Sequence, residues 1–215
     1  IRFPIVFKLR VGAGASNVWL ISSKPQAQKI VRKLFGKGFN QYNYLADFKD
    51  GWENYKSHKL SFKGLLFKLL QFAFPPQQSK LLSIERGYFY FQEFIPENTF
   101  DVRLIIIGGE KAYGMKRIVR KNDFRASGSS DFVYDGMPAD VLSIGFQVAQ
   151  RLGLQSVALD FIFENGSPLI TEISCFFGTK GSAKCKGYWT PDFKWHEGGV
   201  NPYGWMISDL MKVEF

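Results

Sequence analysis

Two tight-turn dipeptides, each set between runs of β-forming residues, constrain the fold of this chain more than any other feature. The runs cover 101–107 and 110–120 around Gly108-Gly109, and 157–163 and 168–174 around Asn165-Gly166. Gly-Gly and Asn-Gly favour two-residue hairpin turns, so each pair of runs is expected to form an antiparallel hairpin. Because these hairpins alternate with helical patterns, the sequence predicts an α+β fold with antiparallel sheets.

The segments outside the hairpins follow simple periodicities. Residues 3–10 alternate, with Ile5, Phe7 and Leu9 on one face, and a glycine-rich turn leads to a second strand at 17–21. Helical spacing predicts helices at 23–35 and at 138–152, the second of which ends at Gly153. No regular period is found in the Trp-rich tail that starts at Gly187.

Residues 40–86 interrupt this pattern. They are irregular, aromatic and basic, with one amphipathic helix expected at 61–72, and they lack a sustained alternation of strands and helices. We interpret them as an insertion within a smaller subdomain, 1–90, which precedes a larger subdomain, 91–215.

The basic charge of the chain is concentrated in and just before this insertion. The net charge is +9, yet residues 24–86 hold 12 basic and 4 acidic side chains, whereas the rest of the chain holds 16 and 15. A charge spread of this kind favours a docking surface for an acidic substrate, an acidic partner or a lipid surface. Nucleic acid is a less favoured partner than the total charge suggests.

Several classes of protein are excluded by what the chain lacks. Cys175 and Cys185 form no disulfide framework and match no metal spacing, so we expect reduced thiols in a cytoplasmic protein. His58 and His196 are too few for a histidine-rich zinc site. No apolar run approaches the roughly 20 residues of a membrane span, so no transmembrane segment is expected. The chain begins without Met in strand-like sequence, and an N-terminal portion is expected to be missing.

Two acids stand out in the second hairpin. Asp160 is the one charged residue of its otherwise apolar strand, and Glu172 is the one acid of the next strand. If Asn165-Gly166-Ser167 forms a three-residue loop, the two carboxylates face each other, and a divalent cation would remove their repulsion. Ser174 would then point into the same site, whereas a strict two-residue turn would place the two acids on opposite faces. The alternative is a pair of separately solvated acids.

The first hairpin and the glycine-rich turn give weaker signals. A loop of Gly108 and Gly109 alone would place Asp101, Arg103 and Lys116 on one face, which is either a site or a solvated face with one ion pair. The turn at 12–16 lacks the features of a Walker loop, and it is either a phosphate-capping loop or an ordinary flexible hairpin.

Taken together, these segments resemble the ATP-grasp superfamily, especially its carboxylate–amine ligase branch, which includes the ribosomal-protein glutamate-tail ligases. The resemblance covers roughly residues 1–20 and 88–182. The matching segments are 3–8 with 11–16, 91–96, Asp101-Val-Arg103, Lys116-Arg117, 122–128, Ala158-Leu-Asp160 and 170–174. The tail also resembles segments of ATP-grasp proteins linked to surface-polysaccharide biosynthesis.

The resemblance implies a role for each matching residue. Phosphate contacts would come from Lys8 and from the turn residues Gly12, Gly14 and Ser16. Adenine would be lined by Gln92, Glu93, Phe94 and Ile95, and the ribose hydroxyls would contact Asp101. Lys116 would lie near the phosphates, and Arg103 and Arg125 would lie near the transferred phosphoryl group or the acyl phosphate. Magnesium would be held by Asp160, Glu172 and Ser174, where Ser174 replaces the Asn usual in the family.

The fold implied is that of two antiparallel-sheet subdomains that hold ATP between them, after an N-terminal domain that this chain lacks. The activity implied is ATP-dependent ligation of a carboxylate, from a small molecule or a polymer, to an amine, with ATP and Mg²⁺ as cofactors. An ATP-grasp-like kinase of a hydroxyl or sugar substrate is the nearest alternative enzyme. A non-catalytic basic module for nucleic acid or a membrane surface is the alternative without catalysis.

Overall fold

The chain forms two compact units, Ile1–Phe94 and Ile95–Phe215. The computed structural model describes residues 1–10, 17–42, 44–56, 58–71, 74, 83–120, 123–128, 131–179, 181 and 184–212. The boundary lies after residue 94 rather than after 90, because strand β5 (Phe91–Glu93) pairs with strand β1 (Ile5–Lys8) of the first unit. No helix in the described part of the chain has the length and hydropathy of a membrane-spanning segment.

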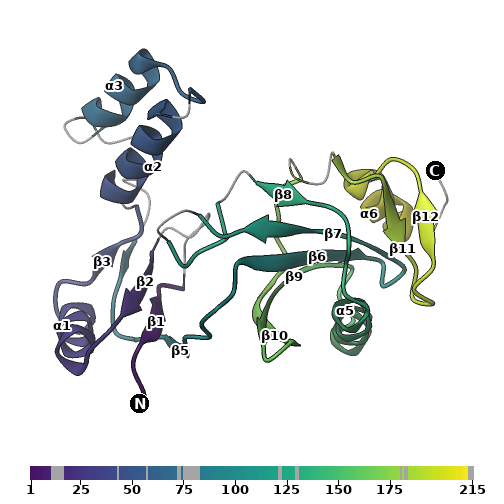
Figure 1. Cartoon of the computed structure of the whole chain (residues 1–215), viewed down its shortest axis with the longest axis horizontal. Coiled ribbons are helices and arrows are strands. Elements are labelled where there is room, and N and C mark those ends of the chain that lie inside the picture. Colours follow the sequence, from purple (N-terminus) through teal and green to yellow (C-terminus); the bar gives the residue numbers. More distant parts are fainter. Residues whose placement is uncertain are drawn as a thin grey trace. The chain divides into compact units, whose positions relative to one another are not determined.

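The first unit is built on a three-stranded antiparallel sheet in the order β2-β1-β5, with β2 at Val18–Ile21 (Figure 1). The predicted face of Ile5, Phe7 and Leu9 is confirmed, since all three side chains are buried in one core. Helix α1 (Lys24–Leu34) adds Leu34 to this core. The alternating pattern therefore identified the inner face of the sheet correctly.

The segment 40–86, which the sequence predicts to be mostly irregular, contains two helices. Strands β3 (Phe39–Asn40) and β4 (Ile84–Glu85) pair with each other, and α2 (Tyr44–Lys56) and α3 (Phe62–Leu70) lie between them in the chain. Ser61 begins α3 by accepting a hydrogen bond from the backbone N–H of Gly64 at 3.2 Å. The insertion is thus a helical hairpin that starts and ends on one short β-ribbon.

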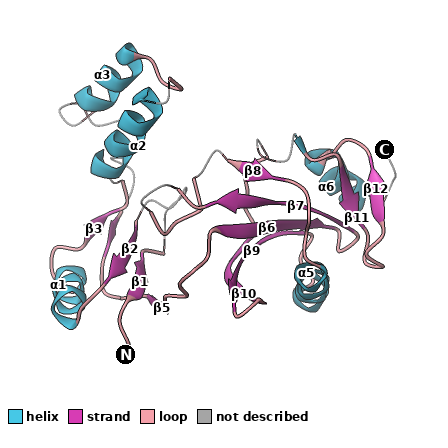
Figure 2. Ribbon diagram, in the orientation of Figure 1, coloured by secondary structure: helices cyan, strands magenta, loops and turns pink. Residues whose placement is uncertain are grey.

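The second unit contains a larger sheet whose described pairs are all antiparallel, which confirms the α+β prediction (Figure 2). Its strands lie in the order β10-β9-β6-β7-β11-β12, and β8 also pairs with β7. The strands are β6 (Phe100–Ile107), β7 (Lys111–Ile118), β8 (Phe132–Val133), β9 (Ser156–Glu164), β10 (Ser167–Ser174), β11 (Gly187–Trp189) and β12 (Trp195–Glu197). The helices are α5 (Ala139–Leu152) and α6 (Pro202–Met211).

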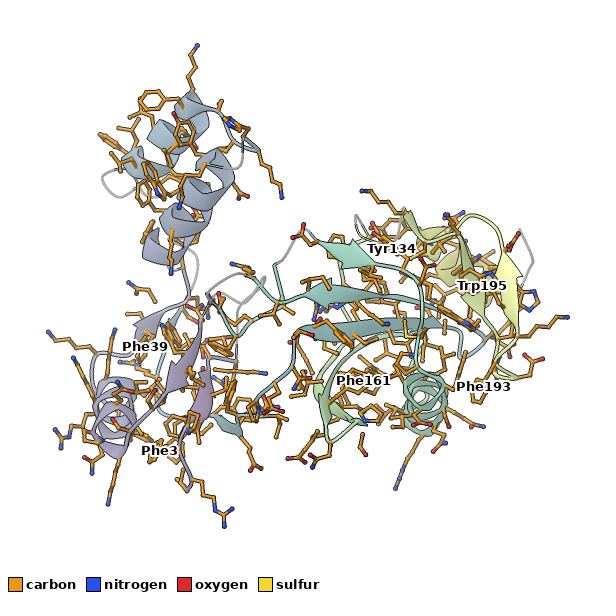
Figure 3. All side chains as sticks on the ribbon, viewed as in Figure 1. Phe3, Phe39, Tyr134, Phe161, Phe193 and Trp195 are labelled. Atoms are coloured by element: carbon orange, nitrogen blue, oxygen red, sulfur yellow. The ribbon has the colours of Figure 1, made fainter. Side chains whose placement is uncertain are left out.

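Helix α5 covers one face of this sheet. As predicted, α5 ends at Gly153, which adopts a left-handed conformation with φ 59°. Val141, Leu142 and Phe146 of α5 pack on a core from β6, β7 and β9 that includes Phe161, labelled in Figure 3. This face is apolar at its centre.

The opposite face is divided into two parts. One part is a second core, in which Tyr113 packs against Trp205 of α6 at 6.0 Å between ring centroids. The tail residues 187–212, in which the sequence shows no regular period, thus form β11, β12 and α6 and close this core. The other part of the face carries charged side chains and forms the candidate site.

Gly114 is required for the close approach of β6 and β7 beneath that site. A Cβ atom at this position would lie 2.4 Å from the backbone oxygen of Arg103 and 3.2 Å from the Cα of Leu104. We expect Gly114→Ala to lower the free energy of unfolding by about 1–3 kcal/mol, because backbone cannot move aside as a side chain can. Urea unfolding would measure this, with Gly178→Ala as the control, since a Cβ there meets nothing within 4 Å.

Candidate active site

A row of directly paired residues crosses four strands of the second unit, and three of the strands contribute a charged side chain. Glu172 of β10 lies opposite Asp160 of β9, Asp160 lies opposite Arg103 of β6, and Arg103 lies opposite Met115 of β7. Directly paired residues of a sheet project from the same face. The pairing therefore brings two acids and one guanidinium onto the face that α5 does not cover.

The predicted facing of Asp160 and Glu172 is confirmed, but for a different reason from the one expected. The turn has two residues, since Ser167 pairs with Glu164, and this alone would separate the two acids. A β-bulge between Ile170 and Glu172 shifts the register by one residue and restores the pairing. The Thr171 hydroxyl at the bulge donates a hydrogen bond of 3.1 Å to the backbone oxygen of Asp160. Ser174, opposite Ala158, shares the face of Glu172.

The predicted position of Lys116 is wrong. The turn at Gly108 has three residues, because Ile107 pairs with Lys111 and the Glu110 N–H donates to the Ile107 oxygen at 3.1 Å. Lys116 therefore pairs with Val102 and lies on the α5 side of the sheet, with its Nζ 5.3 Å from the ring centroid of Phe100. One extra turn residue is enough to move a side chain to the other face.

Arg117 occupies the place that the sequence analysis assigned to Lys116. It pairs with Asp101 and is only 5% exposed. Its Nε and Nη2 donate to the two carboxylate oxygens of Asp101, each at 2.6 Å, and Nη2 also lies 2.8 Å from Asp160 Oδ2. The sequence pointed to Lys116, the neighbour of Arg117 in the motif Lys116-Arg117. The length of the turn at Gly108 is the signal that would have identified Arg117 instead.

Four residues thus form one connected cluster of charges, Asp101, Arg103, Arg117 and Asp160. Arg103 completes it by donating from Nε to Asp160 Oδ1 and from Nη2 to Oδ2, both at 2.7 Å. Asp160 is 4% exposed and Asp101 is 9% exposed. Buried charges of this kind are tolerated only when they are paired and hydrogen-bonded, as these are. We call this set the arginine–aspartate cluster.

The two aspartates of the cluster differ in their electrostatics. Burial would raise the pKa of Asp160, but the hydrogen bonds and positive charges of Arg103 and Arg117 outweigh it and hold that pKa below its ordinary value. Burial raises the pKa of Asp101, which has a bidentate bond to Arg117 alone and is close to the negative charge of Asp160. Asp160 is therefore the firmly ionised acid of the cluster at neutral pH.

Asp160 and Glu172 fit a magnesium ion whose coordination is completed by other oxygen ligands. Asp160 Oδ1 accepts one hydrogen bond and Oδ2 accepts two, so Oδ1 keeps an acceptor position. Glu172 is exposed next to it. Among the described residues, no three His, Cys, Asp or Glu side chains gather as a metal site. Two carboxylates suit Mg²⁺, which is commonly held by one or two carboxylates together with substrate phosphates.

Ser174, the other predicted metal ligand, and Arg125, the third predicted cation, each bond to a partner within the chain. The Ser174 hydroxyl donates to the backbone oxygen of Phe176 at 2.8 Å, so its contact with a metal stays a prediction. Arg125 forms a bidentate pair with Asp123, whose Oδ2 lies 2.7 Å from Nη2. Burial opposes the ionisation of Asp123, but Arg125 outweighs it and holds the pKa below its ordinary value.

The nucleotide-binding residues predicted for the first unit are placed only in part. Lys8 and Gln92 share one face of the β2-β1-β5 sheet, because Gln92 pairs with Val6, two residues before Lys8. Glu93 pairs with Ile5 and projects from the other face. Phe94 and Ile95 follow β5 at the boundary of the two units. The predicted phosphate-capping residues, Gly12, Gly14 and Ser16, lie outside the described residues.

The two cysteines are free thiols, as predicted, and lie in different environments. Burial raises the pKa of Cys185 to about 11, whereas Cys175, next to Ser174, is exposed. We expect a thiol reagent at pH 8 to label Cys175 rapidly and to leave Cys185 unlabelled until denaturant is added, because only about one Cys185 in a thousand would be a thiolate. A Cys175→Ser variant that still reacts as fast as the parent chain would contradict this.

Comparisons with known proteins agree with this geometry. A family model described as the RimK-like ATP-grasp domain matches residues 76–188, more than half of the chain. A probable alpha-L-glutamate ligase of Nitrosococcus oceani is 31% identical over 101 residues, which are 45% of this chain and 33% of that protein. The ribosomal protein bS6–L-glutamate ligase of Escherichia coli is 27% identical over 47% of this chain and 35% of its own length. The chain thus spans about a third of the length of these curated relatives.

A solved structure supports the fold over the entire chain. The biotin carboxylase domain of Hydrogenobacter thermophilus 2-oxoglutarate carboxylase, solved with MgADP, ADP and bicarbonate, superposes with a TM-score of 0.57 and 11% sequence identity. The match covers 100% of this chain and 38% of that one. The match of the family model, the antiparallel sheets and this likeness lead to one conclusion: the chain belongs to the RimK-like ATP-grasp domain family.

Proposed function

We propose that this chain binds ATP with Mg²⁺ and uses it to join a carboxylate to an amine. The observation that carries the proposal is the pairing of Asp160 with Glu172 beside the arginine–aspartate cluster. The glutamate ligases among the relatives support this class of reaction. In it, a carboxylate oxygen bonds to the γ-phosphorus as the bond to ADP breaks. The amine nitrogen then attacks the acyl carbon, loses a proton and displaces phosphate.

Asp160 Oδ1 and the Glu172 carboxylate would hold the magnesium ion. When bound, the ion would neutralise charge on the phosphate oxygens of ATP. The bulge at Thr171 acts as a positioning device, because without its one-residue shift Glu172 would project from the other face. The two carboxylates are therefore held ready on adjacent strands before the nucleotide binds.

Arg103 is the cation we assign to the transferred phosphoryl group or the acyl phosphate. Its Nε and Nη2 are held by Asp160, while its side chain is 21% exposed. The Nη1 group, which does not bond to Asp160, can therefore face an anionic ligand in a fixed orientation. Holding the two reactants in a fixed geometry supplies on the order of 7–11 kcal/mol in reactions of this kind.

Arg117 and Asp101 act on this site as positioning residues. Arg117 joins both aspartates from a buried position, and both oxygens of Asp101 are bonded to it. This burial favours a positioning role for Asp101 over the ribose contact expected for it. In this proposal phosphate contacts Lys8, adenine contacts the backbone around Gln92–Ile95, and the reacting groups contact Arg125. A contact of Lys116 with phosphate remains a prediction that its place on the α5 side does not favour.

The substrates of the proposed reaction are a carboxylic acid and an amine. The acid and the amine belong to small molecules or to polymers, and the use of ATP and the free thiols support a cytoplasmic location. Turnover of ATP by the full-length protein, measured against a panel of carboxylic acids and amines, tests the proposal. ADP release that requires both an acid and an amine is the expected result. A phosphorylated product formed without any amine would identify a kinase instead.

A further inference from the structure

Helix α3 presents its apolar side chains to solvent. Six large apolar side chains of α3 and the segment after it are between 46% and 77% exposed. We call this set the α3 apolar face: Phe62, Leu66, Phe67, Leu69, Leu70 and Phe74. Contiguous exposed patches of large apolar residues mark interaction sites more often than single exposed residues do.

The contacts between α2 and α3 define which side of α3 faces outward. Leu65 is buried at 6% exposure, and Lys68 Nζ lies 2.6 Å from Asp47 Oδ1 of α2. At 3.6 residues per turn, Phe62, Leu66 and Leu70 then align along the side of α3 that is turned away from these contacts. The apolar face is thus held in place by the helical hairpin itself. Figure 3 shows side chains projecting on all sides of the α2–α3 pair.

The segment that carries this face has charge of one sign, whereas α2 supplies acids, among them Asp47 beside Lys68. Residues 54–83 contain five lysines and no Asp or Glu. Of these lysines, Lys56, Lys59 and Lys63 are exposed. Trp52 and Tyr55 lie close by, with 6.0 Å between their ring centroids, and Tyr55 in turn contacts Phe62. Lysines beside aromatic and leucine side chains suit a boundary between water and an anionic apolar phase.

We propose that the α3 apolar face docks on the surface of a lipid bilayer that contains anionic lipids. A helix of nine residues is too short to cross the roughly 30 Å hydrocarbon layer, so α3 would lie in the plane of the interface. The composition favours lipid over a protein partner, because protein interfaces are depleted in lysine and enriched in arginine. Residues 54–83 contain five lysines and no arginine. Docking would bring the ligase to substrates at a membrane surface.

Flotation of the full-length protein with vesicles tests the proposal. Vesicles of phosphatidylcholine alone are compared with vesicles that also contain phosphatidylglycerol. We expect binding to the anionic vesicles only, weakened by added salt. Phe67→Gln should weaken binding about tenfold or more, and Lys63→Gln about fivefold, since each loses part of the apolar or the electrostatic attraction.

Two matched variants serve as controls. Leu210→Gln removes an apolar side chain of α6 that is 70% exposed, and Lys29→Gln removes an exposed lysine of α1. Both should bind vesicles as the parent chain does. Equal binding of the parent chain to neutral and anionic vesicles, or no loss in Phe67→Gln, would overturn the proposal. Self-association that Phe67→Gln abolishes, without any vesicle binding, would also overturn it and identify a protein interface.

Discussion

Glu172→Ala is expected to reduce Mg²⁺-dependent ATP turnover of the full-length protein by about a hundredfold or more. If Glu172 holds the metal as proposed, its loss removes several kcal/mol of stabilisation from the charge that develops on the phosphoryl group. Glu172 is exposed, and the cluster beneath it keeps all its ion pairs, so the free energy of unfolding should change by less than about 0.5 kcal/mol. Steady-state ADP release and urea unfolding, measured on one preparation, separate the two effects.

Glu164→Ala provides the matched control for this variant. Glu164 is an exposed acid at the end of β9 in the same hairpin. Its removal should leave turnover within about twofold of the parent chain. If Glu172→Ala retained near-normal turnover, the assignment of Glu172 to the metal would be wrong, whatever the turnover of the Glu164→Ala variant.

Arg117→Met is expected to lower the free energy of unfolding by about 3–5 kcal/mol. This substitution leaves the buried carboxylate of Asp101 without its bidentate partner and Asp160 with Arg103 alone. An unpaired buried charge costs far more than the pair itself contributes. Urea unfolding at pH 7 would measure the change. Part of the loss should be recovered near pH 4, because protonation removes the charge of Asp101, whose pKa is already raised in the parent chain.

Lys116→Met, at the preceding residue, is the control for Arg117→Met. Lys116 lies on the α5 side of the sheet, where its Nζ is 5.3 Å from the Phe100 ring centroid. Its replacement should cost less than about 1 kcal/mol, because partly exposed cation–π contacts contribute little. Equal destabilisation by the two variants would mean that the turn at Gly108 has two residues after all, and that the cluster described here does not form.

The two hairpins illustrate how far local patterns identify a site. Asn165-Gly166 and Gly108-Gly109 both mark turns, and the strands on either side form as predicted within one or two residues. The register differs from expectation in both. In the hairpin at Asn165-Gly166 a bulge restores the expected pairing of Asp160 with Glu172. In the hairpin at Gly108-Gly109 an extra turn residue places Arg117, and not Lys116, opposite Asp101.

The tail and the insertion show a second kind of difference. Trp189 pairs with Ala112, and Tyr188 and Tyr113 both pack on Trp205, at 5.0 and 6.0 Å between centroids. These contacts join residues far apart in the chain, so the short strands and helix of 187–212 have no strong periodicity of their own. The helices of the insertion likewise depend on contacts between α2 and α3, such as that of Lys68 with Asp47.

The features that could be derived from the amino-acid sequence are those with a local cause. Side-chain alternation identified the buried face of Ile5, Phe7 and Leu9, Gly153 marked the end of α5, and the apolar setting of Asp160 marked it as a buried acid that needs a partner. The membership of the arginine–aspartate cluster needed the folded chain, because strand side chains alternate with a period of two. One residue of register, decided by a bulge or a turn, selects which charges meet.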